Sequence, residues 1–489
     1  MQTPGSISPP YAPTPRLAYH HGDSSFRPYL SPQFYLGLPS NTPVLGLSRV
    51  PSPTETVVDR PPPPGHIPTK NFFNVKTFFA RQPEPIPVDA RPHRVSHIAR
   101  RVHGWSWQAF PVGMGTGAVY VSINGLKQQS SAQRTVETVF FFLNLVLFCI
   151  NVSTLALQAL LYPRQAKRLV TDPAKNIYVP LVVLSYATLL IGAINYDQVP
   201  VDVRPDLAYI LFWIYVGLAV AVSFPLLMIW FNRPHDIRNF TPAWMFLVFP
   251  MMLVGVVAFN VLEVMDPAEE RTLGVLFVGY FFQGLGSCVT ILYIAIYLMR
   301  LMMTGFMEGH QANGAFIAVG PPGFTALSLI KLGEQARDIL PRHGVVADIA
   351  GEVWYSASVL AALMMFGLAA FLVVFGALPY WFKLHRQLNE ILGCWALTFP
   401  NVGWIGCLGA LADALNVPGL RTVQIVFVVV LAAVWTVLAV LTVVAFCRGL
   451  IFYDKADDVI ADASHLFEKA GHRTPRSASG QNTPTIHVV

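Results

Sequence analysis

The chain has 489 residues, of which 54% are hydrophobic and 12% charged, and its mean hydropathy is +0.49. Soluble chains usually carry about 25% charged residues, so this composition excludes an ordinary soluble domain and predicts a protein that crosses the membrane several times. The formal net charge of +6 fits loops rich in Lys and Arg at a cytosolic membrane face, and we do not expect nucleic acid as a partner.

The two ends of the chain differ in composition from its middle. The first 100 residues hold 20 of the 39 prolines, including the run PPPP at 61–64. Such a segment buries too little apolar surface to fold alone. We therefore expect a disordered Pro-rich tail over 1–98, a membrane domain of ten helices over 99–455, and a second disordered tail over 456–489.

Ten segments are apolar over about the 20 residues that a membrane-spanning helix requires. They are 105–125, 136–161, 176–195, 207–231, 241–263, 273–303, 313–332, 352–379, 386–414 and 420–452. The tails and the loops expected on their side of the membrane contain 15 Lys and Arg residues near the helix ends. The loops expected on the other side contain 8. Cytosolic loops carry the excess of Lys and Arg, so we expect a multi-pass membrane protein with both tails in the cytosol.

Prolines recur at a nearly constant interval inside the odd-numbered segments. The spacings from Pro111 to Pro180, Pro250, Pro321 and Pro400 are 69, 70, 71 and 79 residues. This periodicity predicts a repeat of two helices that occurs five times. Five hairpins close most simply into a ring, so we expect a quasi-five-fold arrangement around a central pore. Broken, Gly-rich backbone is tolerated where it lines a cavity, which places the Pro-kinked odd helices inside.

Three stretches resemble a known family. ARRVHGWSWQAFPVGMGTGAV at 99–119, FIAVGPPGFTALSLIKLG at 316–333 and WALTFPNVGW at 395–404 are similar to the tellurite-resistance/dicarboxylate transporter family of the voltage-dependent anion channel superfamily. The motifs VGPPGFTAL and TFPN look most like the fungal malic acid, or C4-dicarboxylate, permease branch. The first helix departs from that branch, because it has GMGTG where malate permeases tend to have Ser and Thr.

The resemblance implies a fold of five helical hairpins around a pore and a function in anion transport at the plasma membrane. A phenylalanine beside the break of the ninth helix plugs the pore in that family, and Phe399 matches it. The other expected pore-lining or helix-break positions belong to the odd segments and are Phe110, Pro111, Gly113, Gly115, Thr116, Gly117, Pro180, Phe249, Pro250, Gly320, Pro321, Pro322, Phe324, Thr325, Thr398, Pro400 and Asn401. Related proteins assemble as trimers, so a homotrimer is an expectation as well.

The predicted helices hold no ionisable residue near their middle, which argues against a buried carboxylate that relays protons. Neutral donors such as Thr116, Thr325, Ser328, Thr398 and Asn401 suit a conduction path, because an ion must also be able to leave. A cation, Lys331, lies at the outer end of the seventh segment. It either steers anions or extends to the membrane interface.

Malate and related C4-dicarboxylates are the expected small anion substrates, and the lipid bilayer is the expected surrounding. Efflux of sulfite or another small inorganic anion is the alternative, and a non-transporting membrane scaffold is a third hypothesis. We find no nucleophile motif and no metal-ligand cluster, and we expect no enzyme activity, metal or cofactor.

The tails contain Ser-Pro and Thr-Pro pairs, which are candidate sites for a proline-directed kinase as a regulatory partner. They begin at Thr3, Ser8, Thr14, Ser31, Thr42, Ser52, Thr474 and Thr483. Chance pairs in a Pro- and Ser-rich tail are the equal alternative.

Overall fold

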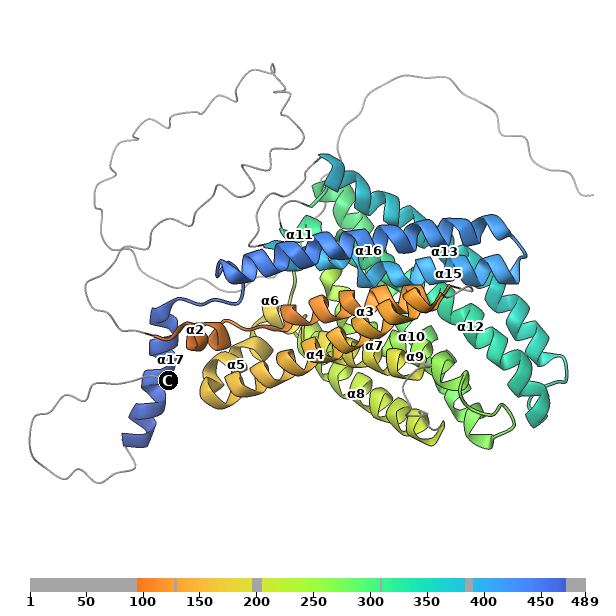
Figure 1. Cartoon of the computed structure of the whole chain (residues 1–489), viewed down its shortest axis with the longest axis horizontal. Helices are drawn as coiled ribbons and strands as arrows, with labels where there is room; N and C mark the ends of the chain where they lie inside the picture. The colour runs from red at the N-terminus through yellow and green to blue at the C-terminus, as the bar shows by residue number, and fades with distance from the viewer. Residues whose placement is uncertain (1–94, 127–129, 196–204, 308–309, 383–389, 472–489) are drawn as a thin grey trace, which may run out of the picture. The chain divides into compact units, whose positions relative to one another are not determined.

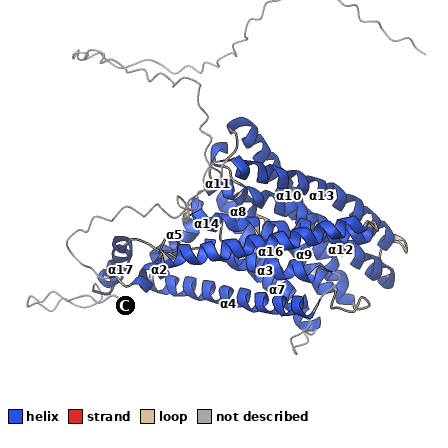
Figure 2. Ribbon diagram, turned by 45° about the horizontal axis from the view of Figure 1, so that its top comes forward, coloured by secondary structure: helices blue, strands red, loops and turns tan. Residues whose placement is uncertain are grey.

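The computed structural model describes residues 95–126, 130–195, 205–307, 310–382 and 390–471, and the regular elements in these ranges are all helices (Figure 1 and Figure 2). The longer α-helices are α3 (Phe110–Asn124), α4 (Ser131–Leu161), α7 (Leu181–Asn195), α8 (Pro205–Phe231), α9 (Phe249–Leu262), α10 (Glu270–Thr304), α12 (Gly320–His343), α13 (Ala350–Phe382), α15 (Val402–Ala414) and α16 (Pro418–Cys447). One boundary differs clearly from its prediction, because α12 continues to His343 as a more polar helix instead of ending near residue 332.

Eight helical stretches of the described chain are long and apolar enough to cross a membrane. They are Ser131–Leu161, Pro173–Asn195, Pro205–Phe231, Glu270–Thr304, Ala315–His343, Ala350–Leu378, Ile391–Ala414 and Pro418–Cys447. The apolar helix α9 has 14 residues and α3 has 15, which is fewer than the roughly 20 that a straight span requires. The predicted class, an all-α membrane protein, is confirmed.

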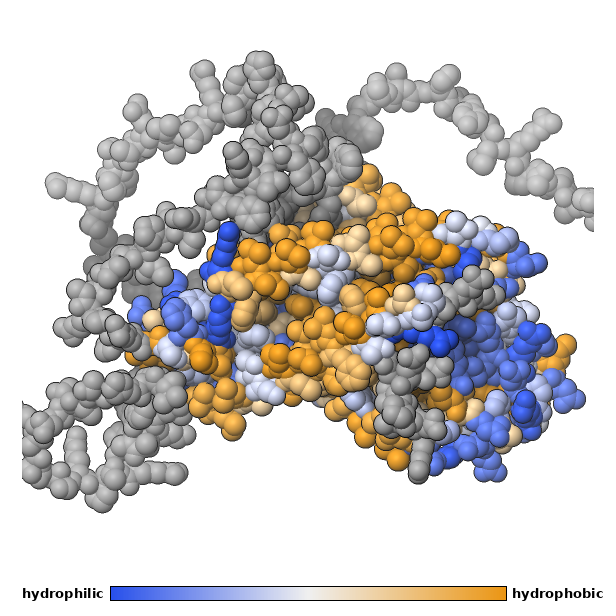
Figure 3. All heavy atoms as spheres, in the orientation of Figure 1, coloured by the Kyte–Doolittle hydropathy of each residue, from blue (hydrophilic) through white to orange (hydrophobic). Residues whose placement is uncertain are grey.

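The odd helices of the predicted hairpins are far more buried than the even ones. The most apolar 18-residue windows of the stretches that contain α7, α12 and α15 are 72%, 83% and 72% buried, whereas those of α4, α13 and α16 are each 22% buried. Every residue of α9 is buried. The even helices present apolar side chains outward, as a surface in contact with lipid requires. In Figure 3 these apolar residues cover much of the visible face, and hydrophilic residues gather near the turns that follow α9 and α12.

The buried helices contact one another in a closed cycle. Helix α3 packs against α7, α7 against α9, α9 against α12, α12 against α15, and α15 against α3. Each of them also packs against the even helix that follows it in the chain, as α3 does with α4 and α15 with α16 (Figure 1). Close approach in this cycle depends on glycine: a Cβ atom on Gly323 of α12 would lie 2.8 Å from the backbone nitrogen of Trp404 in α15.

The repeated prolines lie at or beside the starts of α-helices, so the expected breaks occur where a 3-10 helix or a turn is followed by an α-helix. Pro111 and Pro250 occupy the first turns of α3 and α9, which follow the 3-10 helices η1 (Trp107–Ala109) and η3 (Pro242–Leu247). Pro321 begins α12 in the same way after η4 (Ala315–Val319). A first-turn residue needs no intrahelical acceptor for its N–H, so proline costs little there.

The C-terminal boundary of the membrane domain also requires a correction. Helix α17 (Ala456–Gly471) covers the start of the segment that was expected to be disordered. Its first turns pack with α2 (His97–His103) through a small apolar cluster that includes Val102, Tyr162 and Val459. The imidazole of His103 lies 2.7 Å from the Asp454 carboxylate and 3.0 Å from that of Asp462. These contacts provide the burial that the isolated sequence segment lacks.

Candidate functional site

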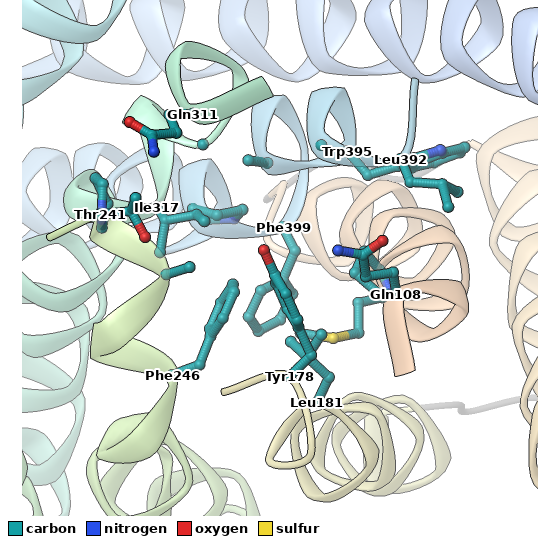
Figure 4. Close-up of a pocket in the computed structure, with 18 residues that line it drawn as sticks. Gln108, Tyr178, Leu181, Thr241, Phe246, Gln311, Ile317, Leu392, Trp395 and Phe399 are labelled. Carbon is teal, nitrogen blue, oxygen red and sulfur yellow. The ribbon is translucent and has the colours of Figure 1, made fainter. Parts of the chain in front are cut away.

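Phe399 lies in the short 3-10 helix η7 (Phe399–Asn401), between η6 (Trp395–Leu397) and the start of α15. Its side chain is 7% exposed. The ring packs against that of Phe324 in α12, with centroids 5.2 Å apart and planes inclined by 34°. Figure 4 shows Phe399 beside Tyr178 and Phe246, which approach it from other elements of the bundle. The helix break therefore places an aromatic ring inside the cycle of buried helices.

Phe399 lines a first cavity, of about 90 Å³, which we call the near cavity. It lies beside the N-terminal ends of the buried helices, where Pro111, Leu181 and Pro400 contribute to its wall. Most of the lining is apolar or aromatic, and the polar side chains come from Gln108, Tyr178, Thr241 and Gln311 (Figure 4). It contains no charged lining residue among those described.

Phe399 also lines a second cavity, of about 340 Å³, which we call the far cavity. Its inner part is apolar and includes Phe324 and Val402. Its outer part contains Glu263 and Asp413, at the C-terminal ends of α9 and α15. Lys331 of α12 and Arg421, from the first turn of α16, are the other charged lining residues. One side chain thus forms part of the wall of both cavities, which approach it from opposite ends of the buried helices.

The charges of the far cavity are partly paired. Nζ of Lys331 donates to Glu334 Oε2 at 2.9 Å and lies 4.0 Å from Glu263 Oε1. Arg421 forms an ion pair with Asp413. Glu263 follows the last residue of α9, and burial raises the pKa of its carboxyl above the ordinary value of 4.5, an effect that Lys331 partly opposes. Lys331 therefore lines this cavity with two acidic neighbours beside it.

Two side chains brace the break that carries Phe399. Asn401 donates from Nδ2 to the Leu397 carbonyl at 2.9 Å, and accepts from Nε1 of Trp404 at 2.8 Å on Oδ1. The Trp404 ring packs edge-on against Phe427 of α16, with centroids 4.6 Å apart. The Leu397 carbonyl has no regular helical partner at this break, and the Asn401 amide supplies one.

Four of the residues expected at the pore line these cavities: Pro111 and Pro400 the near cavity, Phe324 the far one, and Phe399 both. The expected neutral donors lie elsewhere. Thr116 donates to the Val112 carbonyl and accepts from the Trp435 indole. Thr325 accepts from Gln283 of α10, so both hydroxyls face outer helices.

The remaining expected positions support the packing around the breaks. Thr398 is fully buried and donates to the Trp395 carbonyl at 2.6 Å. Phe110 packs against Phe148 of α4, with centroids 6.0 Å apart. The others are buried or partly buried at helix starts or close helix contacts: Gly113, Gly115, Gly117, Pro180, Phe249, Pro250, Gly320, Pro321, Pro322 and Asn401. None of these is in the lining of either cavity.

Several lining residues were missed in the sequence because they precede or end helices. Gln108 and Tyr178 precede α3 and α7, and Asn195 ends α7. Ser122 lies in the last turns of α3 and lines the far cavity. The sequence does show a polar residue near the end of each odd segment. Such a residue can be recognised as part of a cavity wall only when the fold brings the five ends together.

A third cavity, of about 230 Å³, lies near α2 and shares Gln108 and Tyr178 with the near cavity. Lys175 and Asp454 are its charged lining residues. Across the described ranges, no three His, Cys, Asp or Glu side chains are grouped as a metal site requires. The eight Ser-Pro and Thr-Pro sites expected for a kinase lie outside the described residues.

Comparison with known proteins identifies the family of this arrangement. The sequence profile of the voltage-dependent anion channel family matches residues 104–443, which include both cavities. The chain is 26% identical over 399 residues to the malic acid transport protein of Schizosaccharomyces pombe, covering 80% of this chain and 86% of that protein.

A second group of relatives is named for a different activity. The sulfite efflux pump SSU1 of Arthroderma otae is 26% identical over 358 residues, covering 71% of this chain and 92% of the pump. These relatives are membrane transporters, so the expectation that the protein is not an enzyme is confirmed. The matched profile covers most of the chain, and the protein is a member of the voltage-dependent anion channel family of membrane anion transporters.

Proposed function

We propose that the protein transports malate and related C4-dicarboxylates through a central pore that Phe399 closes. The observation that carries the proposal is that Phe399 lines both the near and the far cavity. A path through the molecule would join these cavities at that ring. The malic acid transport relative supports the substrate class.

The proposed pore runs along the axis of the helix cycle. In this arrangement α3 and α9 cross the membrane together with the 3-10 helices that precede them, over 107–124 and 242–262, which brings the number of crossings to ten. The closed cycle of contacts among the five buried helices supports the quasi-five-fold arrangement. The distribution of Lys and Arg supports tails on the cytosolic side, and the near cavity then opens toward the cytosol.

Replacing the aromatic ring tests the gate. In a strain without its own malate uptake, Phe399→Ala is expected to raise labelled-malate flux several-fold, because the two cavities would merge. Phe281→Ala removes an exposed aromatic ring from α10 that lines neither cavity, and it serves as the control. Unchanged flux through Phe399→Ala protein that reaches the cell surface in a folded state would refute the gate.

Sulfite efflux is the second candidate, because the sulfite pumps match this chain at an identity similar to that of the malate transporters. The two functions make opposite predictions for a strain that lacks the protein. Sensitivity to sulfite with normal malate flux would support efflux, and the reverse result would support malate transport. Both substrates should be offered to the same strain, so that the two phenotypes are compared in one genetic background.

We further propose a homotrimer in the membrane and regulation by phosphorylation of the tails. The apolar outer faces of α4, α13 and α16 are compatible with contacts between subunits. Cross-linking in native membranes tests the trimer. Deletion of residues 1–90 tests the regulation: an unchanged transport rate and an unchanged response to phosphatase would exclude it.

A further inference from the structure

Lys331 has hydrogen-bonding capacity that its neighbours do not use. A lysine ammonium group carries three N–H donors. Among the described residues, Glu334 accepts one of them at 2.9 Å, and Glu263 lies at 4.0 Å, beyond hydrogen-bond distance. The Lys331 side chain is 33% exposed and lines the far cavity. The ammonium group can therefore bind a further anionic partner from the cavity without giving up Glu334.

The other cation of the far cavity is bound within the protein. Arg421 donates to the backbone carbonyls of Gly125 and Gly409, to the side chain of Gln424, and to Asp413. These contacts connect α16 to the end of α3 and to α15. Arg421 is thus a structural link between three elements, and Lys331 is the cation better placed to exchange partners.

A buried hydroxyl in the same cavity also lacks a partner. Ser122 is 5% exposed, and its Oγ makes no hydrogen bond to the described residues. Buried polar atoms of folded proteins nearly always have a partner, so an exception in a cavity wall indicates a position where a ligand or a water molecule binds. Ser122 belongs to α3 and Lys331 to α12, which are not adjacent in the cycle of helix contacts. The two residues therefore belong to different walls of the cavity.

We propose that Lys331 and Ser122 form the substrate-binding site of the far cavity, where Lys331 binds one carboxylate of a C4-dicarboxylate and Ser122 hydrogen-bonds a second polar group of the same ion. The inference rests on the proposed function and specifies where its substrate binds. The cavity of about 340 Å³ is within the range of small-molecule sites, which is roughly 300–1,000 Å³. A small inorganic anion with a single charged centre has no second carboxylate to place at Ser122.

Glu263 and Asp413 give this site a moderate affinity. Both carboxylates lie in the wall of the cavity, and they compete with a substrate carboxylate for the cations. A conduction path requires binding that is favourable enough for entry and weak enough for release. The acidic residues are therefore consistent with an anion site, because they prevent Lys331 from holding its substrate too tightly.

The test is the KM of malate uptake in a strain without its own transporter. Lys331→Ala is expected to raise the KM by at least about tenfold, because a charge-assisted hydrogen bond is lost. Lys331→Arg is expected to restore most of the affinity. Arg337→Ala is the matched control: it removes a cation from the same helix, exposed and paired with Glu352, and should leave the KM unchanged.

Ser122→Ala separates a dicarboxylate site from a general anion site. The expected result is a few-fold higher KM for malate and an unchanged concentration of sulfite for half-inhibition of malate uptake. As a second measurement, malate should raise the melting temperature of the purified wild-type protein and not that of Lys331→Ala protein.

Two results would overturn the proposal. One is an unchanged malate KM in Lys331→Ala protein that is folded and at the surface. The other is a Ser122→Ala variant that loses sulfite and malate affinity equally. In either case an enlarged malate flux through Phe399→Ala would still support the proposed transport function, whereas absence of malate flux in every variant and in the wild type would refute that function itself.

Discussion

The indole of Trp404 donates to Oδ1 of Asn401 over 2.8 Å, and the amide nitrogen of Asn401 donates in turn to the carbonyl of Leu397. Phe399 lies between Leu397 and Asn401 in the chain, so these two hydrogen bonds hold the backbone on both sides of the proposed gate. Because Asn401 is only 6% exposed, water cannot easily replace a hydrogen-bond partner that is lost there. The position of the Phe399 ring therefore depends on an amide that does not line either cavity.

Asn401→Ala should loosen the break. The substitution leaves the Leu397 carbonyl and the Trp404 N–H without partners, which costs about 1–3 kcal/mol for a buried group. We expect a lower melting temperature of the purified protein and a raised basal anion flux. Thr422→Ala, an exposed position on α16, is the control. A normal melting temperature together with normal flux in Asn401→Ala would show that the brace has no role.

Gly323→Ala should disrupt the crossing of α12 and α15. An added Cβ atom would lie 2.8 Å from the Trp404 backbone nitrogen, and backbone cannot move away as a flexible side chain can. The expected outcome is a smaller monodisperse fraction on size-exclusion chromatography in detergent. Gly217→Ala is the matched control, since a Cβ atom added there would meet nothing within 4 Å. If both variants behave alike, close packing at Gly323 is not required.

His103 should make the packing of α17 dependent on pH. Burial alone would lower the pKa of its imidazole, but hydrogen bonds to Asp454 and Asp462 outweigh this and raise the pKa above 6.5. The imidazole donates to both carboxylates only when both ring nitrogens carry protons. The stabilisation is therefore fully present below pH 6.5 and is lost as the pH rises through the raised folded-state value.

The pH effect can be measured as the melting temperature of the purified protein, from below pH 6.5 to alkaline pH. Wild-type protein should lose stability as the solution becomes alkaline, and His103→Gln should reduce that loss. His343→Gln is the control, because the His343 ring contacts only the Pro267 carbonyl among the interactions described. Parallel pH profiles for His103→Gln and wild-type protein would contradict a protonated His103.

Glu263 should make transport dependent on pH by a different route. Burial raises the pKa of its carboxyl above 4.5, so acidification neutralises it at a higher pH than it would an exposed glutamate. A neutral Glu263 no longer repels an anion from the far cavity. We expect malate uptake to increase as the pH falls through this raised value, and Glu263→Gln to show a higher flux at neutral pH.

Malate itself also changes charge with pH, so the informative quantity is the difference between variant and wild type. Glu263→Gln should flatten the part of the pH profile that belongs to this carboxyl. Glu352→Gln, an exposed partner of Arg337, should leave the profile as it is. A Glu263→Gln profile that matches the wild type at every pH would exclude an electrostatic role of Glu263 in anion entry.

The sequence by itself determined the class of the protein and the order of its helices. Apolar segments of membrane length are a local property, and the interval from Pro111 to Pro400 marks the starts of the buried helices without any knowledge of contacts. Phe399 was named through a motif that resembles the family, and its role as the gate stays a prediction. The packing of α17 on α2 was missed, because its stabilising partners are more than 350 residues away in the chain.

Only the tertiary structure decided which side chains face the cavities. Thr116 and Thr325 lie in the expected helices but point to Trp435 and Gln283, since the rotation of a nearly uniformly apolar helix is set by its neighbours and leaves little trace in its own sequence. The two cavities that meet at Phe399, and the unused donors of Ser122 and Lys331, arise from several helix ends brought together in space. Which helix ends lie together depends on packing between segments far apart in the chain, and a local sequence pattern does not specify that packing.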